Sequence, residues 1–167
     1  MCRSVFGRGS VFGFMLPLGN TPNTEMSGTS KFASMGIESI RQFVEGKRFV
    51  IVEDDAMVSE ALAKSLTVLG GKVECFFEAE SALQQVNIIL ADYFIVDHML
   101  SGKIDGTGFL LKLSQMMHRT VCAVMMSGNT TSDFIRDAEH FDWPVLHKPV
   151  SVEQLIFQLR EQITKVD

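Results

Sequence analysis

Polar residues that could take part in catalysis follow four separate apolar runs of the chain. The triplet Glu53-Asp54-Asp55 comes directly after one run, and Asp97, Ser127 and Lys148-Pro149 each follow another. Taken singly, each has an ordinary explanation, because acidic triplets are common in solvated turns and an aspartate after a strand often caps a turn. Their occurrence together favours a single shared site.

Groups of these types are suited to moving a phosphoryl group. Three clustered carboxylates repel one another unless a cation joins them, and an all-oxygen cluster favours Mg²⁺. Phosphoryl transfer requires positioning and neutralisation of charge on the phosphoryl oxygens, which Mg²⁺, the Lys148 ammonium and the Ser127 hydroxyl could supply. Asp97 is then the predicted nucleophile, and it would form an aspartyl phosphate.

The apolar runs have the lengths and flanking residues of buried parallel strands. They cover residues 49–52, 73–77, 93–96, 121–126 and 145–146. Amphipathic patterns lie between them, such as the one that stops at Gly70-Gly71 and the last one, which begins with a capping box of Ser151 and Gln154. Five strands alternating with five helices predict an α/β fold with a doubly wound parallel sheet. Ligands of such sheets bind at the carboxyl ends of the strands, where the four polar groups fall.

Three segments are predicted along the chain. Residues 1–35 are rich in glycine, serine and threonine and are expected to form a flexible, disordered N-terminal extension; a signal peptide is a weaker alternative, because the apolar run is short and interrupted by Gly13. Residues 36–47 are predicted to be a short helix or linker, since Ile37, Ile40 and Val44 share one helical face. That helix could pack on the domain or on a partner. Residues 48–167 form the domain.

The segments FVIVEDDAMVSEAL, YFIVDHML, VMMSGN and VLHKPV resemble, in order and spacing, the signature blocks of response-regulator receiver domains of two-component signalling. The resemblance extends from Arg48 to the C-terminus. It implies a flavodoxin-like sheet with the strand order 2-1-3-4-5. The chain resembles both single-domain receivers and those fused to hybrid histidine kinases, which often share its long loop after Asp97 and its VLHKPV ending.

The resemblance implies a role for each group of the predicted site. Asp97 is the phosphoacceptor, Ser127 is the switch hydroxyl, and Lys148 pairs with the phosphoryl group. Mg²⁺ is the implied cofactor, and its site consists of Glu53, Asp54, Asp97 and the backbone carbonyl of Met99. The peptide bond that precedes Pro149 is expected to be cis.

Several positions depart from the usual pattern of the family. Val145 stands three residues before the lysine, where many receivers have Tyr or Phe, so the usual aromatic switch is not expected. Ser101 stands where the family often has Pro. Met99 and Asn129 occupy positions that border the water attacking the phosphate in this family, and the apolar Met99 predicts slow hydrolysis.

Charge and composition restrict the possible partners. The 167-residue chain has a net charge of −5, and residues 48–167 carry 10 basic and 17 acidic side chains, so binding of nucleic acid is not expected. No run approaches the roughly 20 apolar residues of a membrane span. Three widely spaced cysteines fit neither a disulfide framework nor a zinc site. A cytoplasmic protein without membrane contact is therefore expected.

The leading functional hypothesis is a response regulator of a two-component phosphorelay. It would accept a phosphoryl group on Asp97 from a sensor histidine kinase or a histidine phosphotransfer protein and signal by altered binding to an unknown protein target. It would not be an enzyme, beyond catalysing its own Mg²⁺-dependent phosphorylation and dephosphorylation. One alternative is a scaffold or dimerisation module of receiver fold that is never phosphorylated. Another is a Mg²⁺-dependent phosphatase, which would need a second catalytic aspartate where Met99 stands.

Overall fold

A parallel sheet of five strands is the centre of the computed structural model, which describes residues 2–5, 9–12, 36–117, 119–129 and 141–164. Its strands are β3 (Arg48–Val52), β4 (Lys72–Phe76), β5 (Tyr93–Asp97), β6 (Ala123–Ser127) and β7 (Val145–His147). They lie in the order β4-β3-β5-β6-β7, which confirms the predicted order 2-1-3-4-5. Every residue of β5 and β6 is buried, as expected of central strands covered on both faces.

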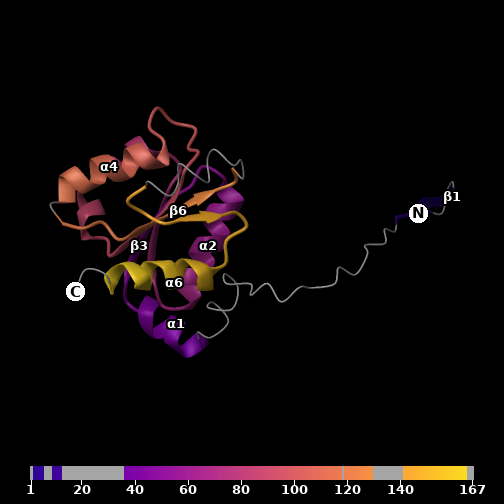
Figure 1. The fold of residues 1–167 in the computed structure, drawn as a ribbon, viewed down its shortest axis with the longest axis horizontal. Coiled ribbons are helices and arrows are strands. Elements are labelled where there is room, and N and C mark those ends of the chain that lie inside the picture. Colours follow the sequence, from indigo (N-terminus) through magenta and orange to yellow (C-terminus); the bar gives the residue numbers. More distant parts are fainter. Residues whose placement is uncertain (1, 6–8, 13–35, 118, 130–140, 165–167) are drawn as a thin grey trace, which may run out of the picture.

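Helices cover both faces of the sheet. On one face lie α2 (Ala56–Val68), α6 (Val152–Ile163) and α1 (Ile37–Val44); on the other lie α3 (Ala79–Leu83), the 3₁₀ helix η2 (Val86–Leu90) and α4 (Gly106–Met117). Figure 1 shows α4 on one side of the sheet and α6 with α1 on the opposite side. The helix expected between β6 and β7 falls on residues 130–140, which lie outside the described residues. The doubly wound α/β fold is confirmed.

The register of the strands brings the polar strand ends together. The pairing of β3 with β5 places Glu53 and Asp97 at the same level of the sheet, each directly after a paired valine. On the other side of β5, β6 ends at Ser127, and its partner β7 ends one residue before Lys148. Because the strands are parallel, their carboxyl ends meet at one edge, and four polar residues converge there.

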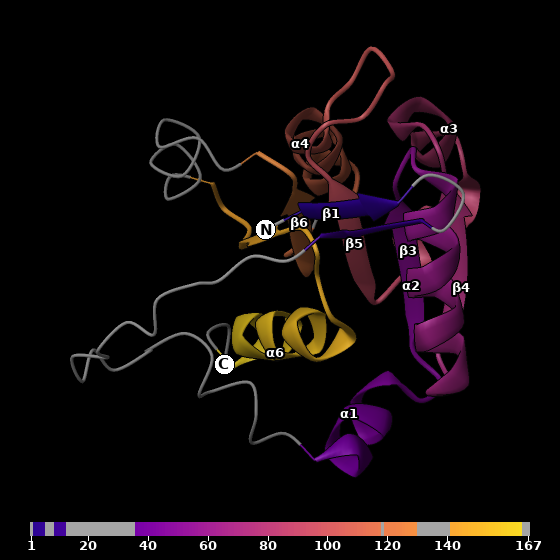
Figure 2. The same cartoon turned by 90° about the vertical axis from the view of Figure 1, so that its right-hand side faces the viewer.

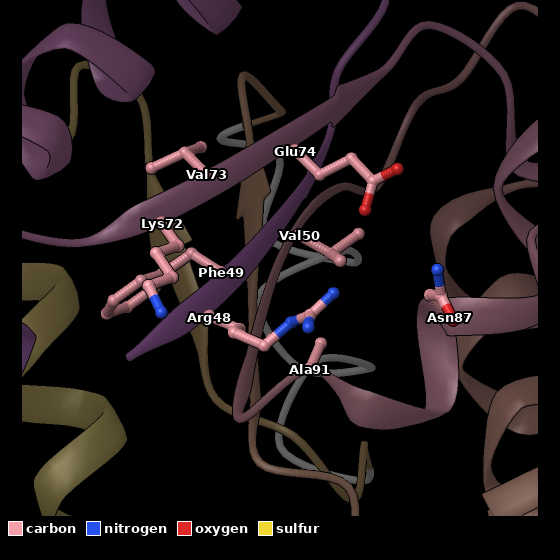
Figure 3. A pocket seen from close by; sticks show the side chains of 8 residues that line it. All are labelled: Arg48, Phe49, Val50, Lys72, Val73, Glu74, Asn87 and Ala91. Carbon is pink, nitrogen blue, oxygen red and sulfur yellow. The ribbon is translucent and has the colours of Figure 1, made fainter. Parts of the chain in front are cut away.

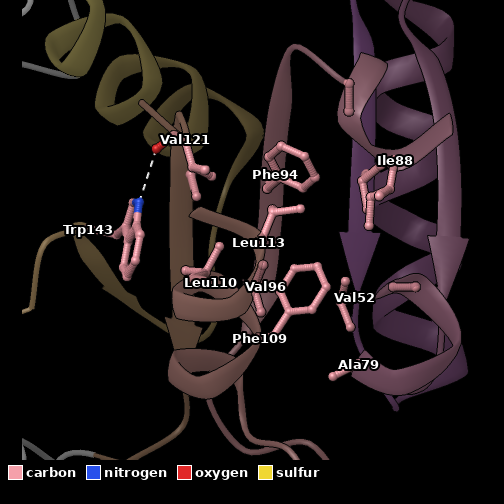
Figure 4. Close-up of a cluster of buried hydrophobic side chains, with 14 of the residues drawn as sticks. Val52, Ala79, Ile88, Phe94, Val96, Phe109, Leu110, Leu113, Val121 and Trp143 are labelled. Atoms are coloured by element: carbon pink, nitrogen blue, oxygen red, sulfur yellow. Dashed lines mark hydrogen bonds between the residues drawn. The ribbon is translucent and has the colours of Figure 1, made fainter. Parts of the chain in front are cut away.

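The core on the α4 side consists of large side chains from the sheet and from that helix. Phe94 and Val96 of β5 face Phe109 of α4 (Figure 4). The indole N–H of Trp143 donates a hydrogen bond of 3.0 Å to the carbonyl of Val121, which satisfies the polar atom of this buried ring. Burial of each aromatic side chain contributes about 2–3 kcal/mol. This core fixes the position of β5, the strand that ends in Asp97.

Specific hydrogen bonds begin the helices that flank the strand ends. The carboxylate of Asp55 accepts hydrogen bonds from the backbone N–H groups of Met57 and Val58, at 2.8 and 3.2 Å. Asp55 is therefore the N-cap of α2, a structural role that the sequence left unassigned. The predicted capping box of Ser151 and Gln154 is present at the start of α6.

The short helix α1 packs on the domain rather than leaving its apolar face open. Ile40 and Val44 are buried in the core between α2 and α6, and the ring of Phe43 stacks on that of Tyr93 with 4.9 Å between centroids. Arg160 of α6 donates a hydrogen bond of 2.9 Å to the Ser39 hydroxyl. Figure 2 shows α1 beside α6. Of the two predicted alternatives, the structure favours packing on the domain.

The segment before α1 contains one element that the sequence did not predict. β1 (Cys2–Val5) pairs antiparallel with β2 (Gly9–Phe12). Residues 13–35 lie outside the described residues. Disorder of the extension over residues 1–35 therefore stays a prediction.

Replacing Ile40 with valine is expected to lower the free energy of unfolding by about 1 kcal/mol, because one buried methylene is lost from the contact between α1 and the domain. Ile37 offers a matched control, since it lies on the same helix and is 77% exposed. Ile37→Val should change the free energy of unfolding by less than about 0.5 kcal/mol. Urea unfolding of both variants measures the difference, and equal losses would show that α1 is not docked as described.

Candidate functional site

Three carboxylates gather at the carboxyl end of the sheet. Glu53, Asp54 and Asp97 each offer one oxygen atom, and these atoms all lie within 4.8 Å of one another. Glu53 is completely buried, Asp97 is 5% exposed, and Asp54 is half-buried. The structure thus brings together the three acidic side chains that the sequence singled out, and it leaves Asp54 as the member closest to solvent.

Lys148 lies against two of these carboxylates. Its Nζ is 3.0 Å from Oδ2 of Asp97 and lies 2.9 Å from Oε1 and 2.7 Å from Oε2 of Glu53. The peptide bond to Pro149 is cis, as the resemblance implied. The backbone N–H of Lys148 donates a hydrogen bond of 2.8 Å to the carbonyl of Ser127, which fixes the lysine to the end of β6. The ammonium group is therefore held at the carboxylates of Glu53 and Asp97.

Burial, hydrogen bonds and neighbouring charges shift the pKa values of Glu53 and Lys148. Burial raises the pKa of the Glu53 carboxyl above its ordinary value, and the negative charge of Asp97 raises it further, although the hydrogen bond from Lys148 acts in the opposite direction. Burial lowers the pKa of Lys148, but its hydrogen bonds to both carboxylates outweigh this effect and leave the pKa raised. Lys148 therefore stays positively charged at neutral pH.

The donor set fits a divalent cation. Three carboxylates and one ammonium leave an excess of two negative charges when all of them are ionised. Oε2 of Glu53 is buried and has no hydrogen-bond donor among the described residues, although the ammonium lies close to it. A hard cation with oxygen ligands such as Mg²⁺ would neutralise this excess. Met99 adjoins the cluster, since its N–H donates to Oδ1 of Asp97 at 3.3 Å.

Ser127 is placed beside this cluster at the end of the neighbouring strand. It is fully buried, and its Oγ accepts a hydrogen bond of 3.0 Å from the N–H of Asn129. Because Asp97 pairs with Met126, the residue before Ser127, the hydroxyl lies one position further along the sheet edge than Asp97. From this position the Ser127 hydroxyl could donate a hydrogen bond to a group attached to the Asp97 carboxylate.

Gly106 supports the site, although the sequence analysis did not single it out. A Cβ atom at this position would collide with the carbonyl oxygen of Asp97 and would come within 3.0 Å of Cα of His98. The N–H of Gly106 donates a hydrogen bond of 3.1 Å to the carbonyl of His98. The start of α4 therefore packs directly on the backbone of Asp97. The only signal in the sequence was a glycine where a helix begins.

A separate hollow of about 320 Å³ lies at the opposite, amino ends of β3 and β4 (Figure 3). Arg48, Lys72 and Glu74 provide its charged side chains, and Asn87 lies across from them. None of the three clustered carboxylates lines this hollow. This hollow and the carboxylate cluster therefore lie at opposite ends of the sheet.

Comparison with protein families identifies the family of this domain. Residues 49–160 match the profile of the response regulator receiver domain. The chain belongs to this family. The match begins at the second residue of β3, includes the other four strands of the five-stranded sheet, and ends within α6. Comparison with curated protein sequences gives no match.

Solved structures of other receivers have the same fold. The receiver domain of the histidine kinase CKI1 from Arabidopsis thaliana, solved with Mg²⁺ and BeF₃⁻, is 21% identical with a TM-score of 0.61, over 77% of this chain and 97% of that chain. A response regulator from Burkholderia pseudomallei with a phosphorylated aspartic acid is 19% identical with a TM-score of 0.57, over 72% and 70%. The Francisella response regulator 1452 receiver domain is 18% identical with a TM-score of 0.59, over 73% and 100%.

This receiver has an aromatic contact near the site that does not come from position 145. Val145 is half-buried and packs against the core on the α4 side. Phe141 packs against the same core, and its ring stacks on His98, with 6.0 Å between centroids. His98 directly follows Asp97. An aromatic ring therefore reaches the residue that follows Asp97 from a position other than Val145.

Proposed function

We propose that this receiver accepts a phosphoryl group on Asp97 from the phosphohistidine of a sensor histidine kinase or a histidine phosphotransfer protein. The observation that carries the proposal is the placement of the Asp97 carboxylate, which contacts the Lys148 ammonium at 3.0 Å and belongs to the carboxylate cluster. A nucleophile, a cation and an oxygen-rich metal site at one point are the parts that phosphoryl transfer needs.

Each residue has a distinct part in the proposed transfer. An oxygen of Asp97 attacks the phosphorus, and the P–N bond of the donor breaks with its electron pair passing to the histidine ring, which takes up a proton. Lys148 neutralises charge on the phosphoryl oxygens, and the Ser127 hydroxyl donates to one of them. Glu53, Asp54, Asp97 and the Met99 carbonyl would hold Mg²⁺, which supplies further neutralisation of the phosphoryl charge.

Two related structures support the proposed chemistry. One relative was solved with a phosphorylated aspartic acid and a calcium ion, and another with Mg²⁺ and BeF₃⁻. In our proposal this chain undergoes the same modification and then binds a downstream protein differently. It acts in the cytoplasm, turns over no external substrate, and binds neither nucleic acid nor membrane. No helix among the described residues is long and apolar enough to span a bilayer.

Intact mass spectrometry tests the proposal directly. The full chain is incubated with Mg²⁺ and acetyl phosphate, and separately with a panel of phosphorylated histidine kinases. A mass increase of one phosphoryl group that is stable in acid and lost in base is the expected result. No increase with any donor would contradict the proposal and would favour the scaffold function instead.

The lifetime of the aspartyl phosphate is expected to depend on Met99. This side chain is 64% exposed, directly beside the acidic cluster. Met99→Asn should shorten the lifetime several-fold, because an amide can hydrogen-bond and orient the attacking water whereas the thioether cannot. The loss of the phosphoryl mass with time, after removal of the phosphodonor, gives the hydrolysis rate of the parent and of the variant. Equal lifetimes in the two proteins would remove this role of Met99.

A further inference from the structure

The loop between β5 and α4 is held by carboxylates from two other parts of the chain. The Ser101 hydroxyl donates a hydrogen bond of 2.6 Å to Oδ2 of Asp54, which follows β3. Two residues later, the backbone N–H of Lys103 donates a hydrogen bond of 2.8 Å to Oε1 of Glu80 in α3. Gly102, between them, passes so close to Glu80 that a Cβ atom there would lie 2.6 Å from Oε2. The loop is therefore held in place on both sides of Gly102.

The hydrogen bond from Ser101 matters for Asp54 because this carboxylate, unlike those of Glu53 and Asp97, is not held by Lys148 or by complete burial. Glu53 and Asp97 are held by Lys148 and by burial. Asp54 is half-buried, and the bond from Ser101 is the only hydrogen bond to its carboxylate within the described part of the chain. Without that bond the side chain could rotate towards solvent. With it, one Asp54 oxygen stays within 4.8 Å of the other two carboxylates.

We infer that Ser101 is a positioning residue of the metal site, and that its hydroxyl holds Asp54 in the orientation in which that carboxylate can ligate Mg²⁺. This inference rests on the proposed function, in which Asp54 is a metal ligand. The distance of 2.6 Å is typical of a strong bond from a hydroxyl to an ionised carboxylate. A carboxylate has about four acceptor positions, so accepting one hydrogen bond leaves room for a cation.

The Ser101 hydroxyl could affect Mg²⁺ binding in two opposite directions, which an experiment can distinguish. If the hydroxyl and the cation used the same lone pair of Oδ2, removal of Ser101 would tighten Mg²⁺ binding. If the hydroxyl orients the ligand, its removal weakens binding, as loss of an outer partner of a metal ligand commonly does by about 10–100-fold. Because Asp54 is partly solvated, we expect a loss near the lower end of this range.

Isothermal titration of Mg²⁺ into the full chain distinguishes these outcomes. Ser101→Ala is expected to raise the Kd for Mg²⁺ about tenfold, and Ser101→Thr, which keeps the hydroxyl, should bind within about twofold of the parent. Ser65→Ala is the matched control, because among the described residues the Ser65 hydroxyl bonds only to the carbonyl of Ala61, on the exposed side of α2. It should leave the Kd unchanged. Thermal unfolding without Mg²⁺ verifies that each variant is folded.

Three results would overturn the inference in distinguishable ways. If the parent binds Mg²⁺ and Ser101→Ala binds equally well or more tightly, Ser101 does not position Asp54 and the proposed metal site stands. If Ser101→Thr binds as weakly as Ser101→Ala, the hydroxyl is not the group responsible. If the parent itself shows no Mg²⁺ binding, the metal site of the proposed function fails, and the role of Ser101 fails with it.

Discussion

Asp97→Asn is expected to abolish the incorporation of a phosphoryl group from acetyl phosphate and from any phosphorylated histidine kinase that labels the parent. An amide oxygen is a far weaker nucleophile than a carboxylate, and the substitution also removes one of the charges that would hold Mg²⁺. Asn has nearly the same shape, so the contact with Lys148 loses charge but not packing. Intact mass and base lability of the product measure the loss.

Asp92 is the matched control for this substitution. It directly precedes the first residue of the same strand, where its Oδ2 accepts a hydrogen bond of 2.8 Å from the backbone N–H of Arg48. Asp92→Asn should be phosphorylated to the same extent as the parent. Equal labelling of Asp97→Asn and the parent would show that another side chain accepts the phosphoryl group.

The fold could be predicted from the sequence because its central strands are continuous apolar runs. Such runs are typical of strands that are buried on both faces, and β5 and β6 are completely buried. The strand order came from the family resemblance, and the structure confirms it. The ends of the strands could not be predicted as well, because backbone pairing with the neighbouring strand decides where a strand ends, and not the apolarity of its residues. Asp97 and Ser127, for example, are the last residues of their strands and not the first residues of the loops that follow.

Convergence of the site residues was predictable for the same reason. In a parallel sheet the carboxyl ends of the strands share one edge, so residues that follow four apolar runs must lie near one another. The structure brings Glu53, Asp54, Asp97 and Lys148 together there. Their roles as phosphoacceptor and metal ligands remain proposals that the experiments above test.

Contacts made by loops could not be predicted, because they depend on how separate elements pack. Nothing in the sequence indicates that Ser101 bonds Asp54 across 47 positions or that Glu80 accepts the N–H of Lys103. The same holds for Gly106, whose missing side chain matters only because α4 starts against the backbone of Asp97. Where α1 packs was open for a related reason: its apolar face fitted either the domain or a partner.

The acidic triplet contains two adjacent aspartates with different surroundings, and this difference leads to a sharp expectation for Mg²⁺ binding. Asp54 belongs to the carboxylate cluster, whereas Asp55 uses its carboxylate to cap α2. Asp54→Asn should raise the Kd for Mg²⁺ by at least tenfold and up to about 100-fold, because loss of a direct ligand costs no less than loss of an outer partner. Isothermal titration of the folded variant gives this value.

Asp55→Asn tests whether the effect belongs to the ligand position or merely to negative charge nearby. Asparagine caps helices about as well as aspartate, so the stability of α2 should be retained. Removal of one exposed charge beside the site should weaken Mg²⁺ binding by only about twofold at physiological salt, because solvent and ions screen it. Similar losses in both variants would mean that the triplet attracts the cation as a diffuse patch. A loss confined to Asp54→Asn would instead make this carboxylate a ligand, and the orientation of that single side chain would then decide how well the receiver binds Mg²⁺.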